Sequence, residues 1–175
     1  MAGLRPLDAP RDVPPRWTSR PFPAYRHVPG LTPHPVTDPR GHSHGEREPE
    51  VDLTGISLPA QWRRCEEYLA GVDLFNAAYL WEAHEAWEAV WHAAGHDTSV
   101  GRFLQGLIQI AAALLHHHRG TREGHRRLHE RAIGLVAALP PDADGYAMGV
   151  PVGEWLRAVD RYLRSDGPYP LLRLG

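Results

Sequence analysis

Helical periodicity begins after residue 58 and dominates the rest of the chain. Apolar residues recur every three or four positions, the spacing of one helix face, over five stretches: 60–75, 79–94, 99–118, 122–138 and 152–164. Pro59 and Pro151 suit helix starts, whereas Gly95, Gly120 and Pro140 suit helix ends. No stretch alternates apolar and polar residues with period two, so no strand is predicted. Short connections favour an all-α fold of about five helices in an antiparallel bundle.

The first 58 residues have a different composition. Eleven of the 17 prolines fall within the first 50 residues, and proline is excluded from helix interiors. We expect about the first 15 residues to be disordered. Residues 17–45 carry apolar anchors, which predicts an extended arm docked on the helices. The chain therefore divides into a proline-rich arm, 1–58, and a helical domain, 59–175.

The stretch WEAHEAWEAVW, residues 81–91, concentrates aromatic, acidic and imidazole side chains on one predicted helix. At 100° per residue, Ala83, Ala86 and Val90 lie on an apolar face that suits the core. The opposite face either is solvated, as charged helix faces usually are, or forms a catalytic or binding surface. It carries Trp81, His84, Glu85, Glu88 and His92.

The helix predicted over 99–118 is apolar on two sides, which is typical of a central helix in a bundle. A polar seam of Gln105, Gln109 and His116 runs between its apolar stripes. Leaving each of these buried groups unpaired would cost roughly 1–3 kcal/mol, so each needs a hydrogen-bond partner. The preceding helix offers the nearest candidates. The sequence thus predicts an internal polar cluster drawn from Glu82, His84, Glu85, Glu88, Gln105, Gln109 and His116.

This cluster has two interpretations: a hydrogen-bond network that fixes helix pairing, or a functional pocket. In a pocket, His84, Glu85 and Glu88 are the candidate catalytic residues. Either glutamate would serve as base or ligand, and His84 as proton carrier or ligand. The candidate binding residues are Trp81, Glu82, Gln105, Gln109 and His116.

A metal site is the more specific form of the second interpretation. The segment HEAWE, 84–88, is related to the HExxH motif of zinc peptidases but has Glu88 in place of the second histidine, so a zinc peptidase is not predicted. Mixed imidazole and carboxylate ligands suit zinc, manganese or iron. The candidate ligands are His84, Glu88 and, if the arm folds over this helix, His42. Alternatively, the arm histidines only anchor the arm.

Composition narrows the range of partners. A net charge of −2 and a pI near 6.6 argue against nucleic acid and anionic membranes as partners. The single Cys65 and the absence of an apolar signal segment in the first 20 residues lead us to expect a cytoplasmic protein. Twelve histidines direct attention to metal binding or proton transfer. A small molecule, another protein or a second copy of the chain remain as partners.

Two segments of the chain resemble a known family. They are LFNAAYLWEAHEAWEAVW, 74–91, and RFLQGLIQIAAALLHHHRG, 102–120. They are similar to the bacterial and archaeal family known as domain of unknown function 309, and the resemblance covers about residues 60–138. It implies an all-helical fold but no established reaction. The matching motif residues are Glu82, His84, Glu85, Trp87, Glu88, Trp91, Gln105, Gly106 and Gln109. The family pattern leads us to expect a glycine in the turn before the helix predicted over 79–94. Ala77 and Ala78 depart from that pattern.

Two functions are compatible with these features. The first is acid–base or metal-assisted chemistry on a small polar molecule, which requires a concave pocket that reaches the glutamates. The second is a non-catalytic interaction module, in which exposed Trp81 and Trp91 dock a protein, since aromatic residues are favoured at interfaces.

Overall fold

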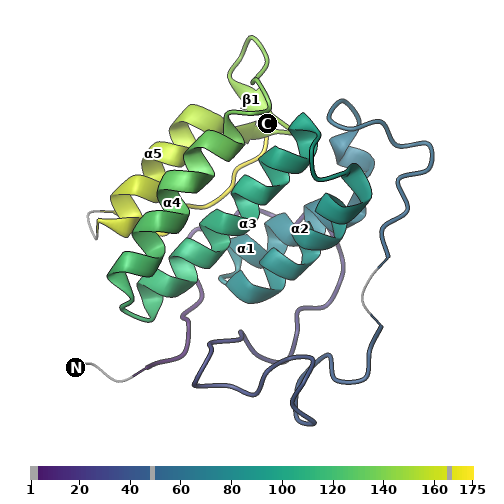
Figure 1. Ribbon diagram of the computed structural model, residues 1–175. Helices are drawn as coiled ribbons and strands as arrows, with labels where there is room; N and C mark the ends of the chain where they lie inside the picture. The colour runs from purple at the N-terminus through teal and green to yellow at the C-terminus, as the bar shows by residue number, and fades with distance from the viewer. Residues whose placement is uncertain (1–3, 48–49, 165–166) are drawn as a thin grey trace.

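The computed structural model describes residues 4–47, 50–164 and 167–175. In these residues the chain is mainly helical, which confirms the all-α prediction (Figure 1). None of the described helices combines the length and apolarity needed to span a lipid bilayer. The elements are a 3-10 turn η1 (Trp62–Arg64), α1 (Glu66–Asn76), α2 (Leu80–Ala94), α3 (Ser99–His118), α4 (Arg122–Val136), β1 (Tyr146–Ala147), β2 (Val150–Pro151) and α5 (Val152–Leu163).

Two expectations about elements are wrong. The helix predicted from residue 60 starts later, because Cys65 is extended (φ −87°, ψ 94°) and separates η1 from α1. The prediction of no strand missed β1 and β2, which pair antiparallel with Ala147 opposite Val150. Each strand has two residues, so a period-two pattern has no room to appear.

Local capping explains why α3 has the bounds that the sequence predicts. Thr98 Oγ1 accepts a hydrogen bond from Gly101 N–H at 2.9 Å and so caps the first turn. At the other end Gly120 has a φ of 75°, and Thr121 N–H donates to His116 O at 2.9 Å. This is the hydrogen bonding of a glycine-terminated helix. Thr121 also precedes α4, but its hydroxyl donates back to His116 O and does not cap that helix.

The turn between α1 and α2 is formed without glycine. Ala78 has a φ of 60°, in the left-handed region, at the position where the family resemblance leads us to expect glycine. That conformation costs a non-glycine residue about 1–2 kcal/mol. Tyr79 N–H donates to Leu74 O at 2.9 Å, which closes the end of α1 and directs the chain into α2. This turn sets where the first residues of α2 point.

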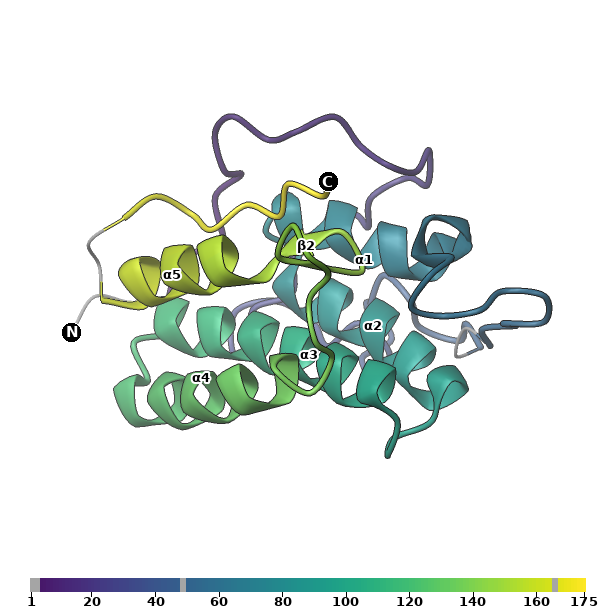
Figure 2. The same ribbon diagram turned by 90° about the horizontal axis from the view of Figure 1, so that it is seen from above.

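The central position of α3 is confirmed. Consecutive helices α1 to α4 pack on one another, and α5 contacts both α3 and α4. Figure 2 shows α5 lying over α3 and α4, on the same side as α1. Both predicted apolar stripes of α3 are buried. They comprise Phe103, Leu107, Ile110 and Leu114, and Leu104, Ile108, Ala111 and Leu115. Burying each large side chain contributes roughly 1.5–3 kcal/mol.

Buried polar side chains of α1 hold the two ends of the chain. The Asp73 carboxylate accepts hydrogen bonds from the backbone N–H groups of Trp17 and Thr18, each at 2.8 Å. Asn76, one turn later, accepts from Leu172 N–H at 2.7 Å and donates to Leu172 O at 2.8 Å. Backbone groups of both terminal segments therefore replace water as the hydrogen-bond partners of the Asp73 and Asn76 side chains.

Part of the segment expected to be disordered contacts the helices. Residues 1–3 lie outside the described residues. Leu7 is buried, and Arg5 O accepts a hydrogen bond from His118 Nε2 at 2.8 Å. Arg173 donates to Asp12 O at 2.7 Å. Residues 5–12 are thus joined to α3 and to the C-terminal segment.

Replacing Gly106 with alanine should lower the free energy of unfolding by about 1–3 kcal/mol, because of overpacking. A Cβ atom there would lie 2.6 Å from Val136 Cγ2 and 3.0 Å from Val136 N. The matched control is Gly134→Ala in α4, where a Cβ meets nothing within 4 Å. The control should stabilise the protein by roughly 0.5–1 kcal/mol. Urea unfolding measures both, and a stabilising Gly106→Ala would contradict the close α3–α4 contact.

Candidate functional site

Glu82, in the first turn of α2, connects that helix to the N-terminal segment. Its side chain is 4% exposed. Oε1 accepts a hydrogen bond from His27 N–H at 2.8 Å and lies 3.0 Å from His42 Nε2. Oε2 is buried and has no partner within the described residues. Two points of the N-terminal segment, 15 residues apart in sequence, therefore meet one carboxylate.

The surroundings of Glu82 shift the pKa of its carboxyl group. Burial raises the pKa of Glu82, while the hydrogen bonds from His42 and from the backbone oppose the shift. The His42 backbone N–H donates to Tyr25 OH at 3.2 Å, and the two rings lie 4.7 Å apart. Tyr25 thereby holds the imidazole against the start of α2.

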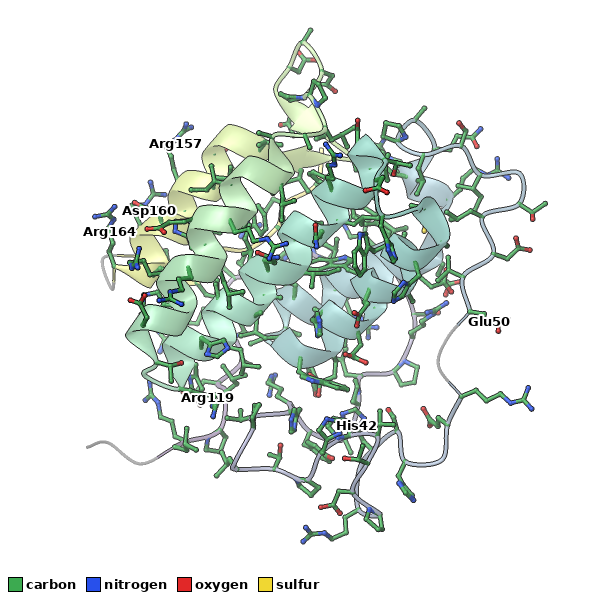
Figure 3. All side chains as sticks on the ribbon, in the orientation of Figure 1. His42, Glu50, Arg119, Arg157, Asp160 and Arg164 are labelled. Atoms are coloured by element: carbon green, nitrogen blue, oxygen red, sulfur yellow. The ribbon has the colours of Figure 1, made fainter. Side chains whose placement is uncertain are left out.

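The position of His42 differs from the one expected for a metal ligand. The N-terminal segment does fold over α2, but it brings His42 to Glu82 and not to His84 and Glu88. His42 is labelled near the lower edge of Figure 3, where the N-terminal segment crosses the molecule. The contact with Glu82 supports the anchoring interpretation of this histidine.

The imidazole of His84 lies between two carboxylates on the outer face of α2. Its Nδ1 is 3.3 Å from Glu85 Oε1, and its Nε2 is 3.8 Å from Glu88 Oε2. One ligand atom from each of the three side chains lies within 4.8 Å of the other two. We call these residues the His84 triad. Burial lowers the pKa of His84, and Glu88 opposes that shift. A neutral imidazole is the form that binds metal ions.

The triad lies beside a hollow of about 1220 Å³. Its described lining comes from the N-terminal segment and from α2, and consists of Arg47, Glu50, Val51, Glu85, Glu88, Ala89, His92 and Ala93. Figure 3 shows Glu50 at the outer edge of the molecule, well away from His42. The hollow reaches both glutamates of the triad, as a functional site requires. Arg47, Glu50 and His92 extend the set of residues that sequence reasoning proposed.

The polar residues of α3 do not join this face. Gln109 Oε1 is buried without a partner in the described part of the chain. His116 Nδ1 bonds to Thr121 Oγ1 at 2.9 Å. No hydrogen bond among the described residues links Glu82 or Glu88 to Gln105 or Gln109. The described hydrogen bonds thus do not join the seven residues expected in one cluster into a single network. The reason is helix rotation, because Ala83, Trp87 and Val90 are fully buried and leave the acids on the flanks of α2.

Trp81 and Trp91, two of the three tryptophans of α2, are half-buried, so the expectation that both are exposed is wrong. The Trp81 ring contacts the imidazoles of His27 and His34, each with a centroid distance of 5.4 Å. Trp91 stacks on His96 at 3.9 Å. Neighbouring imidazoles cover surfaces that an interaction module would need free.

Comparison with known families places this site in its context. Residues 68–128 match the family model Domain of unknown function (DUF309). The resemblance seen in the sequence is therefore confirmed. The DUF309 match covers most of α1, all of α2 and α3, and the start of α4, and includes the His84 triad and Glu82. His42 and α5 lie outside it. A search of curated proteins finds no match to the chain.

Replacing His42 with alanine should lower the free energy of unfolding by about 1–3 kcal/mol, because the Glu82 carboxylate loses a buried partner. Amide exchange should accelerate over residues 25–44. The control is His44→Ala, whose exposed imidazole makes one hydrogen bond in the described part of the chain, to Val36 O at 2.9 Å. It should cost less than about 0.5 kcal/mol. Equal amide exchange rates over residues 25–44 in the two variants would contradict the conclusion that the contact with Glu82 holds this segment on α2.

The free energy of unfolding should fall as the pH decreases from neutrality through 6.5. Burial lowers the pKa of five imidazoles, those of His27, His84, His116, His117 and His129. Between each lowered pKa and the ordinary value of about 6.5, the unfolded chain binds more protons than the fold. Urea unfolding at several pH values measures how steeply the free energy of unfolding changes with pH. His27→Gln should make this slope shallower, and an unchanged slope would show that His27 does not contribute.

Proposed function

We propose that the outer face of α2 binds a divalent metal ion through the His84 triad, and that the neighbouring hollow receives a small polar molecule. One observation carries the proposal: three ligand atoms lie within 4.8 Å of one another beside a hollow that reaches Glu85 and Glu88. These residues come from positions i, i+1 and i+4 of one continuous helix, so the backbone of α2 fixes their spacing.

The donor set supports zinc, manganese or iron. One imidazole nitrogen and two carboxylate oxygens are borderline-to-hard ligands, which suit these ions better than soft thiolate-binding ones. Three protein ligands leave coordination positions for water or substrate, as in catalytic metal sites. A bound ion would lower the pKa of a coordinated water or polarise an oxygen of the substrate. The lowered pKa of His84 favours the neutral imidazole that such binding needs.

The lining of the hollow supports a polar ligand of small size. Arg47 and Glu50 contribute groups of opposite charge from the N-terminal segment, and His92 adds an imidazole from α2. Val51, Ala89 and Ala93 supply apolar surface between them. A few polar groups on an apolar wall are typical of small-molecule sites, where they fix the orientation of the ligand.

The structural-network interpretation is favoured for Glu82 alone. That carboxylate contacts the N-terminal segment through His27 and His42, so a role in holding the fold accounts for it. The triad differs, since its three side chains are between 29% and 39% exposed and therefore accessible to an ion.

Metal titration of the untagged protein tests the proposal. The wild-type protein should bind one Mn²⁺ or Zn²⁺ ion, measured by calorimetry and by metal analysis after dialysis. His84→Gln and Glu88→Gln should each weaken binding by at least about tenfold, because each removes a direct ligand. Circular dichroism should show that both variants keep their helices.

A control separates the triad from the nearby histidine pair. His92 Nδ1 lies 2.8 Å from His96 Nε2, and exposed imidazole pairs of this kind bind added metal without a function. His92→Gln should leave the affinity within about twofold of the wild type. Loss of binding in His92→Gln, with retention in His84→Gln, would assign the ion to the pair and overturn the proposal.

A further inference from the structure

A second cavity, of about 820 Å³, lies between residues 5–12, α5 and the C-terminal residues 168–173. Figure 2 shows the N-terminal segment arching over the C-terminal segment and α5. The volume falls within the range of roughly 300–1,000 Å³ that small-molecule sites occupy. No residue of the His84 triad lines it, so it is separate from the proposed metal site.

The wall formed by the N-terminal segment is anchored near both of its ends. His118 Nε2 donates to Arg5 O at 2.8 Å, and Arg173 donates to Asp12 O at 2.7 Å. Leu7, between these two points, is buried in the hydrophobic core. The segment is thus held over the cavity by the protein itself before any ligand binds, which lowers the entropy cost of binding.

The aromatic wall is also fixed in place. Trp155 Nε1 donates to Pro170 O at 2.9 Å, and Tyr169 OH donates to Phe75 O at 2.6 Å. The ring of Tyr162 packs against that of Tyr169 with centroids 5.6 Å apart. Burial raises the pKa of Tyr162, so its hydroxyl keeps its proton at neutral pH. This hydroxyl has no hydrogen-bond partner within the described residues and can donate to a ligand.

Arginines supply the charge that faces the cavity. The four that line it are Arg5, Arg11, Arg161 and Arg173. Within residues 4–47, 50–164 and 167–175, the guanidinium groups of Arg5, Arg11 and Arg161 make no hydrogen bond or ion pair. The acidic residues of the lining are Asp8, Asp12 and Glu154, one fewer than the arginines. Guanidinium groups that no described residue pairs are suited to a carboxylate or phosphate.

We propose that this cavity binds a small aromatic anion. Arg161 holds its anionic group, and the ring of the ligand packs against the adjacent Tyr162 and against Tyr169. The proposal stands independently of the metal site, since it uses a different cavity and none of the same residues. Asp8 and Glu154 accept hydrogen bonds from hydroxyl or amino groups of the ligand.

Calorimetry of the full chain with four probes tests the chemistry. Adenosine monophosphate and phenyl phosphate combine a ring with an anion, whereas adenosine lacks the anion and inorganic phosphate lacks the ring. At least one of the first two should bind. Adenosine and inorganic phosphate should each bind at least about tenfold more weakly than that ligand. Each of them lacks one of the two groups, ring or anion, that the cavity contacts. If neither aromatic anion binds, or if adenosine binds as tightly, the proposal is overturned.

Two substitutions on α5 locate the site. Arg161→Gln should weaken binding of the aromatic anion by at least about tenfold, because it removes a charge-assisted contact. The matched control is Arg157→Gln, one turn earlier, whose side chain borders a groove with α4 and does not line this cavity (Figure 3). The affinity of the control variant for the aromatic anion should stay within about twofold of that of the wild type. Equal weakening in both variants would indicate unspecific attraction to the arginines of α5 and overturn the proposal.

Discussion

A carboxylate that is removed from water must find hydrogen-bond donors, and Glu82 finds them in the N-terminal segment. The two donors are the backbone of His27 and the imidazole of His42, which precede α2 by many residues in sequence. A desolvated carboxylate without such partners would cost several kcal/mol or take up a proton. Together with the Asp73 contacts of Trp17 and Thr18, these contacts fix the path of the N-terminal segment up to His42, shortly before Arg47 and Glu50 at the hollow.

Successive acids of α2 have different environments because a helix turns by 100° per residue. Glu82 lies under the N-terminal segment, whereas Glu85 and Glu88 lie on a more open flank with His84. The same short sequence therefore supplies a structural contact and a set of accessible ligand atoms. The buried Ala83, Trp87 and Val90 determine this division, since they fix which side of α2 enters the core.

Local signals made much of the fold predictable. The bounds of α3 follow from Thr98 and Gly120, whose capping depends on neighbours in sequence. The grouping of His84, Glu85 and Glu88 was also predictable, because a single helix spaces them. The roles of Asp73 and Asn76 were not, since their partners Trp17, Thr18 and Leu172 lie 55 to 96 residues away along the chain. Which acids of α2 meet Gln105 and Gln109 was not predictable either, since it depends on the rotation of α2 about its axis, which tertiary packing sets.

The anchoring of both chain ends on α1 has a consequence for cooperativity. Asp73 holds the N-terminal segment, and Asn76, one turn further on, holds the C-terminal segment. Fraying of this single turn would remove the hydrogen bonds that both ends make to α1, although terminal segments usually open independently of each other and at little cost. The opening free energies of the two ends should therefore be coupled through this turn of α1.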